Sequence, residues 1–308
     1  MGKIGVILII FIAVIILSTV LTGVVMFAEK ELGFKEGTAR VAVIKLDGEI
    51  MAESEPSIFS STTALTPQRV KDDIDMANKL GVDAMLFEVN SPGGTVLATK
   101  EIGEEIKKVE IPKIALVKEV AASGGYWAAS STDYIIADST SMLGSIGVLG
   151  SQLEFSGLME KYGVGYEQLT AGKYKDAGTP YRKLTPEEKQ MFQEVLDILH
   201  EEFKNQIKEN RKMTQEEIDN VSEGMFYLGS QSVDNKLIDQ IGNRDTAEEK
   251  LKQILNATEI KFVEIEEPPS LLESLTKAMS ANFFYIGKGI GTAITDVKTP
   301  VQNVEVYT

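Results

Sequence analysis

The sequence VAASGGY at residues 120–126 decides how we read this chain. It follows the short apolar run IALV at 114–117 and precedes the small-residue run WAAS at 127–130, an order typical of a strand, a tight turn and a helix. Ser123 would then lie at a helix N-terminus, where unpaired N–H groups and the helix dipole favour a developing negative charge. A small-residue helix packed against a sheet, with no chemistry, would give the same pattern.

Elimination favours Ser123 as a nucleophile. The chain has no Cys, which excludes thiol catalysis, and its one His, His200, falls inside a long charged helical pattern. A Ser-His-Asp triad would depend wholly on His200, and a histidine zinc site usually takes two or three His from the protein. If the chain is a serine hydrolase, the expected general base is therefore a lysine. We expect no metal and no cofactor.

The N-terminus carries a long apolar segment. Residues 4–28 contain no charged side chain, and a run of this length can span a bilayer as a helix. It is too long for the core of a cleaved signal peptide, so we predict a retained signal anchor over 1–28. Lys3 before the span weakly favours a cytoplasmic N-terminus, with the rest of the chain outside the cytoplasm.

The net charge of −15 bears on partners. A domain this acidic is a poor candidate for binding nucleic acid, because phosphate backbones repel it. Anionic lipid should repel it as well, so we expect contact with the membrane to depend on the anchor.

Strands and helices alternate after a charged linker at 29–39. Apolar runs predict strands at 41–46, 84–90, 113–117, 134–137, 164–169 and 259–265, and helical periodicity lies between most of them. This order predicts an α/β fold with a mainly parallel, helix-covered sheet. We assign 40–265 to one domain and 266–308 to a C-terminal helix and tail.

Two further stretches resemble parts of an active site. The sequence SPGG at 91–94 follows a predicted strand and precedes a helix, and such a turn can supply free N–H groups to an oxyanion hole, although ordinary strand–helix turns look the same. The polar loop at 170–180 carries Lys173 and Lys175, and it ends at TPEE (185–188), which is typical of a capped helix start. Nothing in the residues themselves separates the two lysines.

Taken in order, the motifs form a set. FEVNSPGG at 87–94, AASGGY at 121–126, GSIGV at 144–148 and GKYKD at 172–176 together resemble the signal peptide peptidase A family, peptidase family S49, in its short single-copy form. The resemblance runs from about Val41 to Gly242. It implies a ClpP/crotonase-like fold and a membrane-anchored serine endopeptidase with a Ser-Lys dyad, which degrades remnant signal peptides and other peptides near the membrane.

The resemblance also implies roles for individual residues. It makes Ser123 the nucleophile, Lys175 the general base, and the backbone N–H groups of Gly94 and Gly124 the oxyanion hole. Ser145 would orient the lysine amine. Glu88 and Trp127 depart from the family pattern. These departures bear on substrate preference and not on the chemistry.

The family further implies a ring-like homo-oligomer on the cell membrane, with serine and lysine of one site supplied by neighbouring protomers. Two alternatives remain at this point. A crotonase-type acyl-CoA enzyme would share the oxyanion layout but need a carboxylate instead of Ser123, and a non-catalytic membrane scaffold would keep the fold alone.

Overall fold

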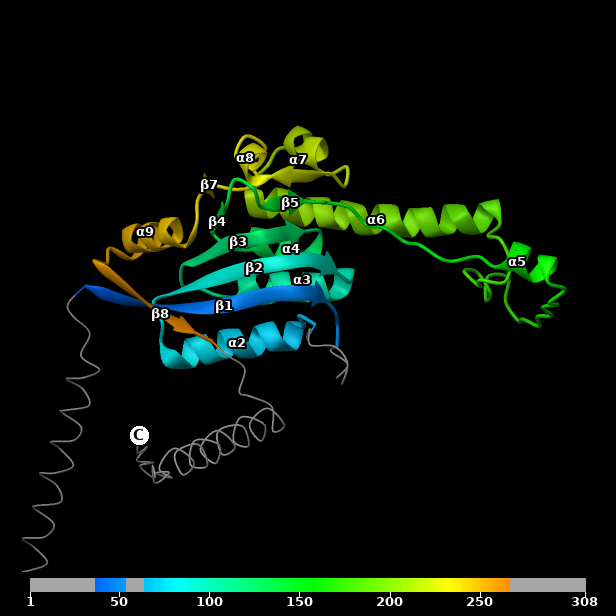
Figure 1. Cartoon of the computed structure of the whole chain (residues 1–308), viewed down its shortest axis with the longest axis horizontal. Coiled ribbons are helices and arrows are strands. Elements are labelled where there is room, and N and C mark those ends of the chain that lie inside the picture. The colour runs from blue at the N-terminus through cyan, green and yellow to red at the C-terminus, as the bar shows by residue number, and fades with distance from the viewer. Residues whose placement is uncertain (1–36, 54–63, 266–308) are drawn as a thin grey trace, which may run out of the picture. The chain divides into compact units, whose positions relative to one another are not determined.

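A single sheet organises the chain. The computed structural model describes residues 37–53 and 64–265, which build a mixed α/β domain (Figure 1). Its eight strands follow the order β6-β5-β3-β2-β1-β8, with β4 paired to β3 and β7 paired to β4. All pairs are parallel except β5 with β6. The strands are β1 (Thr38–Ile50), β2 (Ala84–Gly94), β3 (Lys113–Ala122), β4 (Tyr134–Ala137), β5 (Met142–Gly144), β6 (Phe226–Leu228), β7 (Gln240–Ile241) and β8 (Glu259–Glu264).

The helices begin and end where local chemistry predicts. Thr66 accepts a hydrogen bond from the Arg69 N–H at the start of α2 (Pro67–Leu80), and Gly81 ends that helix in the left-handed region. Thr185 and Glu188 form a capping box at the start of α6 (Pro186–Arg211). The other described helices are α3 (Val96–Lys107), α4 (Gly124–Ser130), α5 (Ser156–Lys161), α7 (Gln215–Val221), α8 (Gly229–Ser232) and α9 (Arg244–Leu255).

Apolar side chains cover both faces of the sheet. On one face, Ile44 and Phe87 pack with residues of α2, α3 and α4 and with Phe203 of α6 in the larger core. On the other face, Leu86 packs with Leu251 of α9 in a smaller core. Helices therefore lie on both sides of a mainly parallel sheet, as the alternating sequence pattern predicts.

The strands change register at one end of the sheet. Between β1 and β2, Asp47 pairs with Asn90 but Glu49 pairs with Gly93, so β2 gains one residue. Between β2 and β3, Val89 pairs with Val117 but Ser91 pairs with Ala121. Both irregularities fall just before the two glycine turns, as bulges next to functional sites often do.

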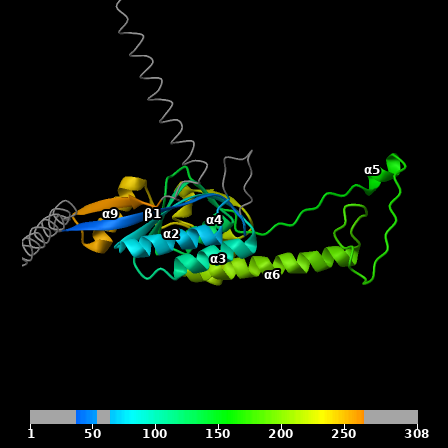
Figure 2. The same ribbon diagram turned by 90° about the horizontal axis from the view of Figure 1, so that it is seen from below.

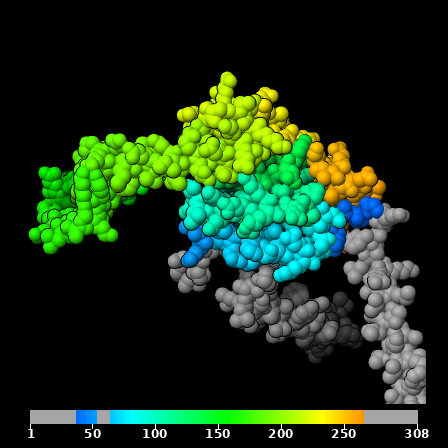
Figure 3. Space-filling view, turned by 180° about the vertical axis from the view of Figure 1, so that it is seen from behind, coloured from blue at the N-terminus to red at the C-terminus, as the bar shows by residue number. Residues whose placement is uncertain are grey.

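Residues 149–185, which we call the arm, leave the sheet and return to the start of α6 (Figure 2). The arm contains α5, and in the figure it extends beyond the N-terminal end of α6. It exposes many apolar side chains, including Leu169 at 95 % and Leu149 at 84 %. The space-filling view shows the arm and the first half of α6 away from the rest of the described chain (Figure 3).

Three sequence expectations need comment. The predicted strand at 164–169 is wrong: those residues form no strand in the arm, because no neighbouring strand is there to pair with them. The predicted anchor at 1–28 and the C-terminal helix and tail at 266–308 lie outside the described residues. Within residues 37–53 and 64–265, no helix combines the length and apolar character needed to cross a bilayer.

Candidate active site

Ser123 lies in a strained turn between β3 and α4. Its backbone has φ 51° and ψ −123°, a combination that a residue with a side chain rarely adopts. The turn is held from two sides: the Ser123 N–H donates to Gly144 O at 2.8 Å, and its carbonyl accepts from the Trp127 N–H at 3.1 Å. Within the described chain its hydroxyl does not cap α4, although Ser is a preferred capping residue. The strain therefore holds the hydroxyl away from the helix and leaves it available.

The two glycine turns meet at this point. A Cβ atom added to Gly93 would lie 2.6 Å from Gly124 N and 2.8 Å from Ser123 Cβ, so only glycine fits there. A Cβ on Gly94 would lie 1.8 Å from the Ile50 carbonyl oxygen, so Gly94 packs on the end of β1. Gly124 opens α4, where the first N–H groups of a helix have no partner inside the helix.

Ser91 holds the backbone around Gly93 in place, a role that the sequence pattern does not reveal. Ser91 is fully buried. Its hydroxyl donates to Gly48 O at 2.6 Å and accepts from the Gly93 N–H at 3.2 Å. The Gly93 N–H is thereby engaged. A Cβ on Gly125 would lie 2.4 Å from Ser91 O, so β2 and α4 approach closely at this residue.

A cavity of about 680 Å³ opens over the turn. Three predicted site residues line it together with Ser123, namely Gly94, Gly124 and Ser145. Its apolar wall includes Trp127 and Phe203, whose stacked rings have centroids 4.9 Å apart. The remaining lining residues are Glu49, Pro92, Gly93, Thr95, Val96, Thr99, Gly147, Val148, Leu149 and Gly224.

Ser145 has the second unusual backbone of the cavity. Its φ is 50°, and its N–H donates to Met225 O at 2.7 Å, which ties the segment after β5 to the strand β6 region. The strand β5 ends at Gly144, and Ser145, Gly147, Val148 and Leu149 after it line the cavity.

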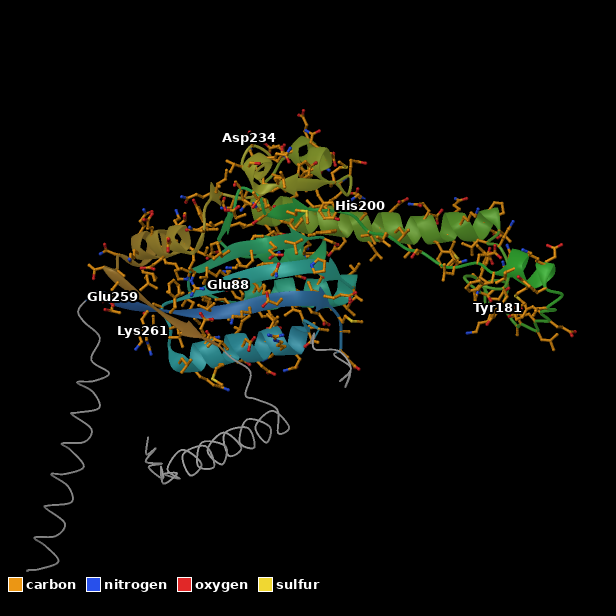
Figure 4. All side chains as sticks on the ribbon, viewed as in Figure 1. Glu88, Tyr181, His200, Asp234, Glu259 and Lys261 are labelled. Atoms are coloured by element: carbon orange, nitrogen blue, oxygen red, sulfur yellow. The ribbon has the colours of Figure 1, made fainter. Side chains whose placement is uncertain are left out.

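Lys175 is not among the described residues that line the cavity. It lies in the arm, exposed to solvent, and none of the described residues forms an ion pair with its ammonium group. Figure 4 labels Tyr181, six positions further along the arm, well away from the sheet. Within one described chain, therefore, the structure brings Ser123, Ser145 and the two glycines together but does not bring Lys175 to them.

The neighbouring lysine has a different environment. The Lys173 ammonium donates to both carboxylate oxygens of Glu187, at 2.7 and 2.8 Å, and this contact raises the pKa of Lys173 above its ordinary value. A base must lose its proton, so Lys173 is the poorer candidate. Beside it, Arg182 binds both Asp176 and Glu188, which fastens the loop to the start of α6.

Two other singled-out residues lie elsewhere. His200 is on α6 (Figure 4), does not line the cavity, and its Nε2 is buried without a hydrogen-bond partner in the described part of the chain. Glu88 forms an ion pair with Arg244 of α9, on the side of the sheet opposite to the larger core. The residue that departs from the family pattern therefore has a local partner of opposite charge. Trp127, in contrast, belongs to the cavity wall.

Sequence reasoning missed several cavity residues. Thr99 is 1 % exposed, and its hydroxyl has no partner among residues 37–53 and 64–265. A Cβ on Gly124 would lie 2.2 Å from this hydroxyl. Phe203 and Glu49 reach the cavity from α6 and β1, over large sequence separations that no local motif records.

Comparison with known proteins agrees with the motifs. The family model for peptidase family S49 matches residues 105–258, which include both Ser123 and Lys175. A candidate protease of Methanocaldococcus jannaschii is 30 % identical over 279 residues, which cover 87 % of this chain and 86 % of the relative. A candidate signal peptide peptidase SppA of Enterococcus faecium is 33 % identical over 257 residues, covering 80 % and 75 %.

Among solved structures, a mutant of ClpP1 from Listeria monocytogenes aligns at a TM-score of 0.44 and 15 % identity, covering 66 % of this chain and 92 % of that one. The ClpP/crotonase-like assignment stays a prediction from the resemblance. The match to the family model and the identity to the relatives show that the chain belongs to peptidase family S49.

Proposed function

We propose that this chain is a membrane-anchored serine endopeptidase with a ClpP/crotonase-like fold, in which Ser123 attacks the peptide and Lys175 of a neighbouring protomer is the base. The observation that carries the proposal is the strained backbone of Ser123, whose hydroxyl does not cap α4 within the described chain and which lines a glycine-rich cavity. Enzyme nucleophiles are often held on such strand-to-helix turns, which point the hydroxyl outward.

The chemistry needs donors for the oxyanion that forms when Ser123 attacks. Gly124 offers the first N–H of α4, and Gly94, which lines the same cavity, offers the second. The Gly93 N–H already donates to Ser91, which is consistent with Gly94 in that role. Each such donor contributes about 10²- to 10³-fold to the rate in other hydrolases.

The base must be a neutral lysine, although an exposed lysine is protonated at pH 7, with a pKa near 10.4. Taking a lysine side chain out of water favours its neutral form, because burial disfavours the charged one. The exposed apolar side chains of the arm support such burial by a second copy of the chain. Ser145, which lines the cavity, would then form a hydrogen bond with the Lys175 amine of that second copy.

The proposed substrates are peptides, including signal peptides left after secretion. This part of the proposal draws on the family and on the name of the Enterococcus faecium relative. The apolar cavity wall formed by Trp127 and Phe203 suits the apolar side chains of such peptides. The predicted anchor would hold the enzyme at the cell membrane, with its N-terminus in the cytoplasm and the protease domain outside.

The nucleophile is tested with the full chain in detergent micelles. Ser123→Ala should abolish cleavage of a quenched-fluorescence peptide and labelling by a fluorophosphonate, whereas Ser230→Ala, an exposed serine of α8, should change neither. Labelled wild type and unlabelled Ser123→Ala would support the proposal. Peptide cleavage that survives in Ser123→Ala would overturn it.

The same experiment addresses the alternatives. An acyl-CoA enzyme would use a carboxylate, and Glu49 is the one carboxylate among the described residues that line the cavity. Turnover of an acyl-CoA by Ser123→Ala would favour that function, and a chain that neither cleaves peptides nor reacts with the label would favour a scaffold.

The shared site is tested by mixing inactive subunits. Ser123→Ala and Lys175→Ala should each be inactive, but mixed oligomers should regain activity at interfaces that join an intact Ser123 to an intact Lys175. Lys183→Ala, another exposed arm lysine, should stay active alone. If differential tags show that mixed oligomers form and they remain as inactive as either parent, the site lies within one chain.

A further inference from the structure

One charged residue lines the cavity that holds Ser123. Glu49, at the end of β1, is the only Asp, Glu, Lys, Arg or His among the described residues that line it. Glu49 is exposed, while the next residue, Ile50, is fully buried in the larger core. The alternation along β1 thus turns the Glu49 side chain away from the core.

The bulge in β2 accounts for the place of Glu49 beside the nucleophile. Because β2 gains one residue there, Glu49 pairs with Gly93, and Gly93 in turn lies against Ser123 and Gly124. Gly48, just before Glu49, has φ 90° and accepts the Ser91 hydrogen bond through its carbonyl. The pairing of Glu49 with Gly93 therefore holds Glu49 beside the turn that carries Ser123.

The charge of the described cavity lining has one sign. No basic side chain of the described residues lines the cavity, and the chain as a whole carries a net charge of −15. A cleft with one sign of charge concentrates ligands of the opposite sign, and low-dielectric walls strengthen the effect. The walls here are apolar in part, through Trp127, Phe203 and Val148.

We propose that Glu49 makes this site selective for cationic peptides, those that present a Lys or Arg side chain close to the scissile bond next to an apolar residue. The proposal rests on the proposed peptidase function. The apolar residue would pack in the wall formed by Trp127 and Phe203, and the cation would pair with the Glu49 carboxylate. A Lys or Arg stem also packs on apolar surface while its charged end stays at the rim.

The test uses pairs of quenched peptides that differ only by Lys or norleucine at one position, scanned across the scissile bond. At one position, wild type should cleave the Lys peptide about two- to fivefold more efficiently, as expected for an exposed ion pair. In Glu49→Gln this ratio should fall to about one, and in Glu49→Lys it should invert. Raising the salt concentration should reduce the wild-type ratio, because ions screen an exposed pair.

Glu119→Gln is the matched control, because Glu119 is an exposed strand carboxylate outside the cavity. It should keep the wild-type ratio. If Glu49→Gln slows Lys and norleucine peptides by one common factor, Glu49 acts on the catalytic groups and the selectivity proposal is overturned. The proposal also fails if cleavage depends on Ser123 but wild type shows no preference for Lys at any position. Absence of all Ser123-dependent cleavage would instead reject the peptidase function itself.

Discussion

The contact between the two glycine turns of the active site gives the sharpest stability prediction. Gly93 has φ 95°, where a residue with a side chain is strained, and its Cβ position is occupied on three sides. The obstacles are Gly124 N at 2.6 Å, Ser123 Cβ at 2.8 Å and Ala122 O at 2.9 Å. These are backbone and turn atoms, which cannot rotate away as the end of a flexible side chain would. Gly93→Ala must therefore move the turn that carries the nucleophile.

The expected cost follows from two terms. An unfavourable backbone conformation costs about 1–3 kcal/mol, and overpacking costs about 1–3 kcal/mol, so we expect a loss of about 2–6 kcal/mol in the free energy of unfolding. A shift of Gly124 also moves one oxyanion donor, which should lower kcat by about 10²-fold or more in the folded fraction.

Gly81→Ala is the matched control. Gly81 also has a positive φ, 60°, but the nearest atom to its added Cβ is Arg40 Nη2 at 3.5 Å, an ordinary contact. We expect a loss of only about 1–2 kcal/mol and normal kcat. Urea unfolding measures the first quantity, and peptide cleavage below the unfolding transition measures the second. The reasoning is refuted if Gly93→Ala is as stable as Gly81→Ala and cleaves as fast as wild type.

Three further predictions concern the surroundings of the site. The Arg182 guanidinium lowers the pKa of Glu188 to about 2. The stabilisation from this pair is therefore present above the unfolded pKa of about 4.3 and is lost as pH falls through about 2. Glu188→Gln should remove this acid-dependent loss, which proteolysis of the arm between pH 5 and pH 2 would measure. Thr99→Val removes a buried hydroxyl that has no hydrogen-bond partner among the described residues, so the free energy of unfolding should stay within about 1 kcal/mol of wild type or rise; a loss above about 2 kcal/mol in urea would contradict this. Phe203→Ala should cost about 3–5 kcal/mol in thermal unfolding, because it empties the space against the Trp127 ring; a change below about 1 kcal/mol would mean that the wall collapses to fill the gap.

Local patterns predicted the parts of the site that lie within short stretches of sequence. The turn at Ser123 could be anticipated because apolar strand, glycine pair and small-residue helix follow one another directly, and SPGG at 91–94 repeats the arrangement. The mainly parallel sheet followed from alternating strands and helices, and the structure confirms it. Capping at Thr185 was readable because both partners lie within one turn of helix.

The parts of the site that local patterns did not predict depend on contacts between segments far apart in the sequence. The bulge in β2 places Gly93 against Ser123, and no pattern in SPGG tells which glycine faces the nucleophile and which packs on Ile50. Phe203 reaches the Trp127 ring from a separate helix. The false strand at 164–169 shows the converse, since none of the described strands pairs with these residues.

The arm connects these observations to the chemistry. Its apolar side chains, such as Leu169, are exposed to an extent that a solitary soluble domain rarely tolerates, and the first half of α6 adds Ile198 at 69 %. Ion pairs through Lys173 and Arg182 order the loop but leave Lys175, between them, without an acidic partner among the described residues. A carboxylate beside a lysine favours the charged form of that lysine, so a general base is better placed without one. A neighbouring protomer that covers the apolar arm would exclude water, so assembly and activation of the base would be one event.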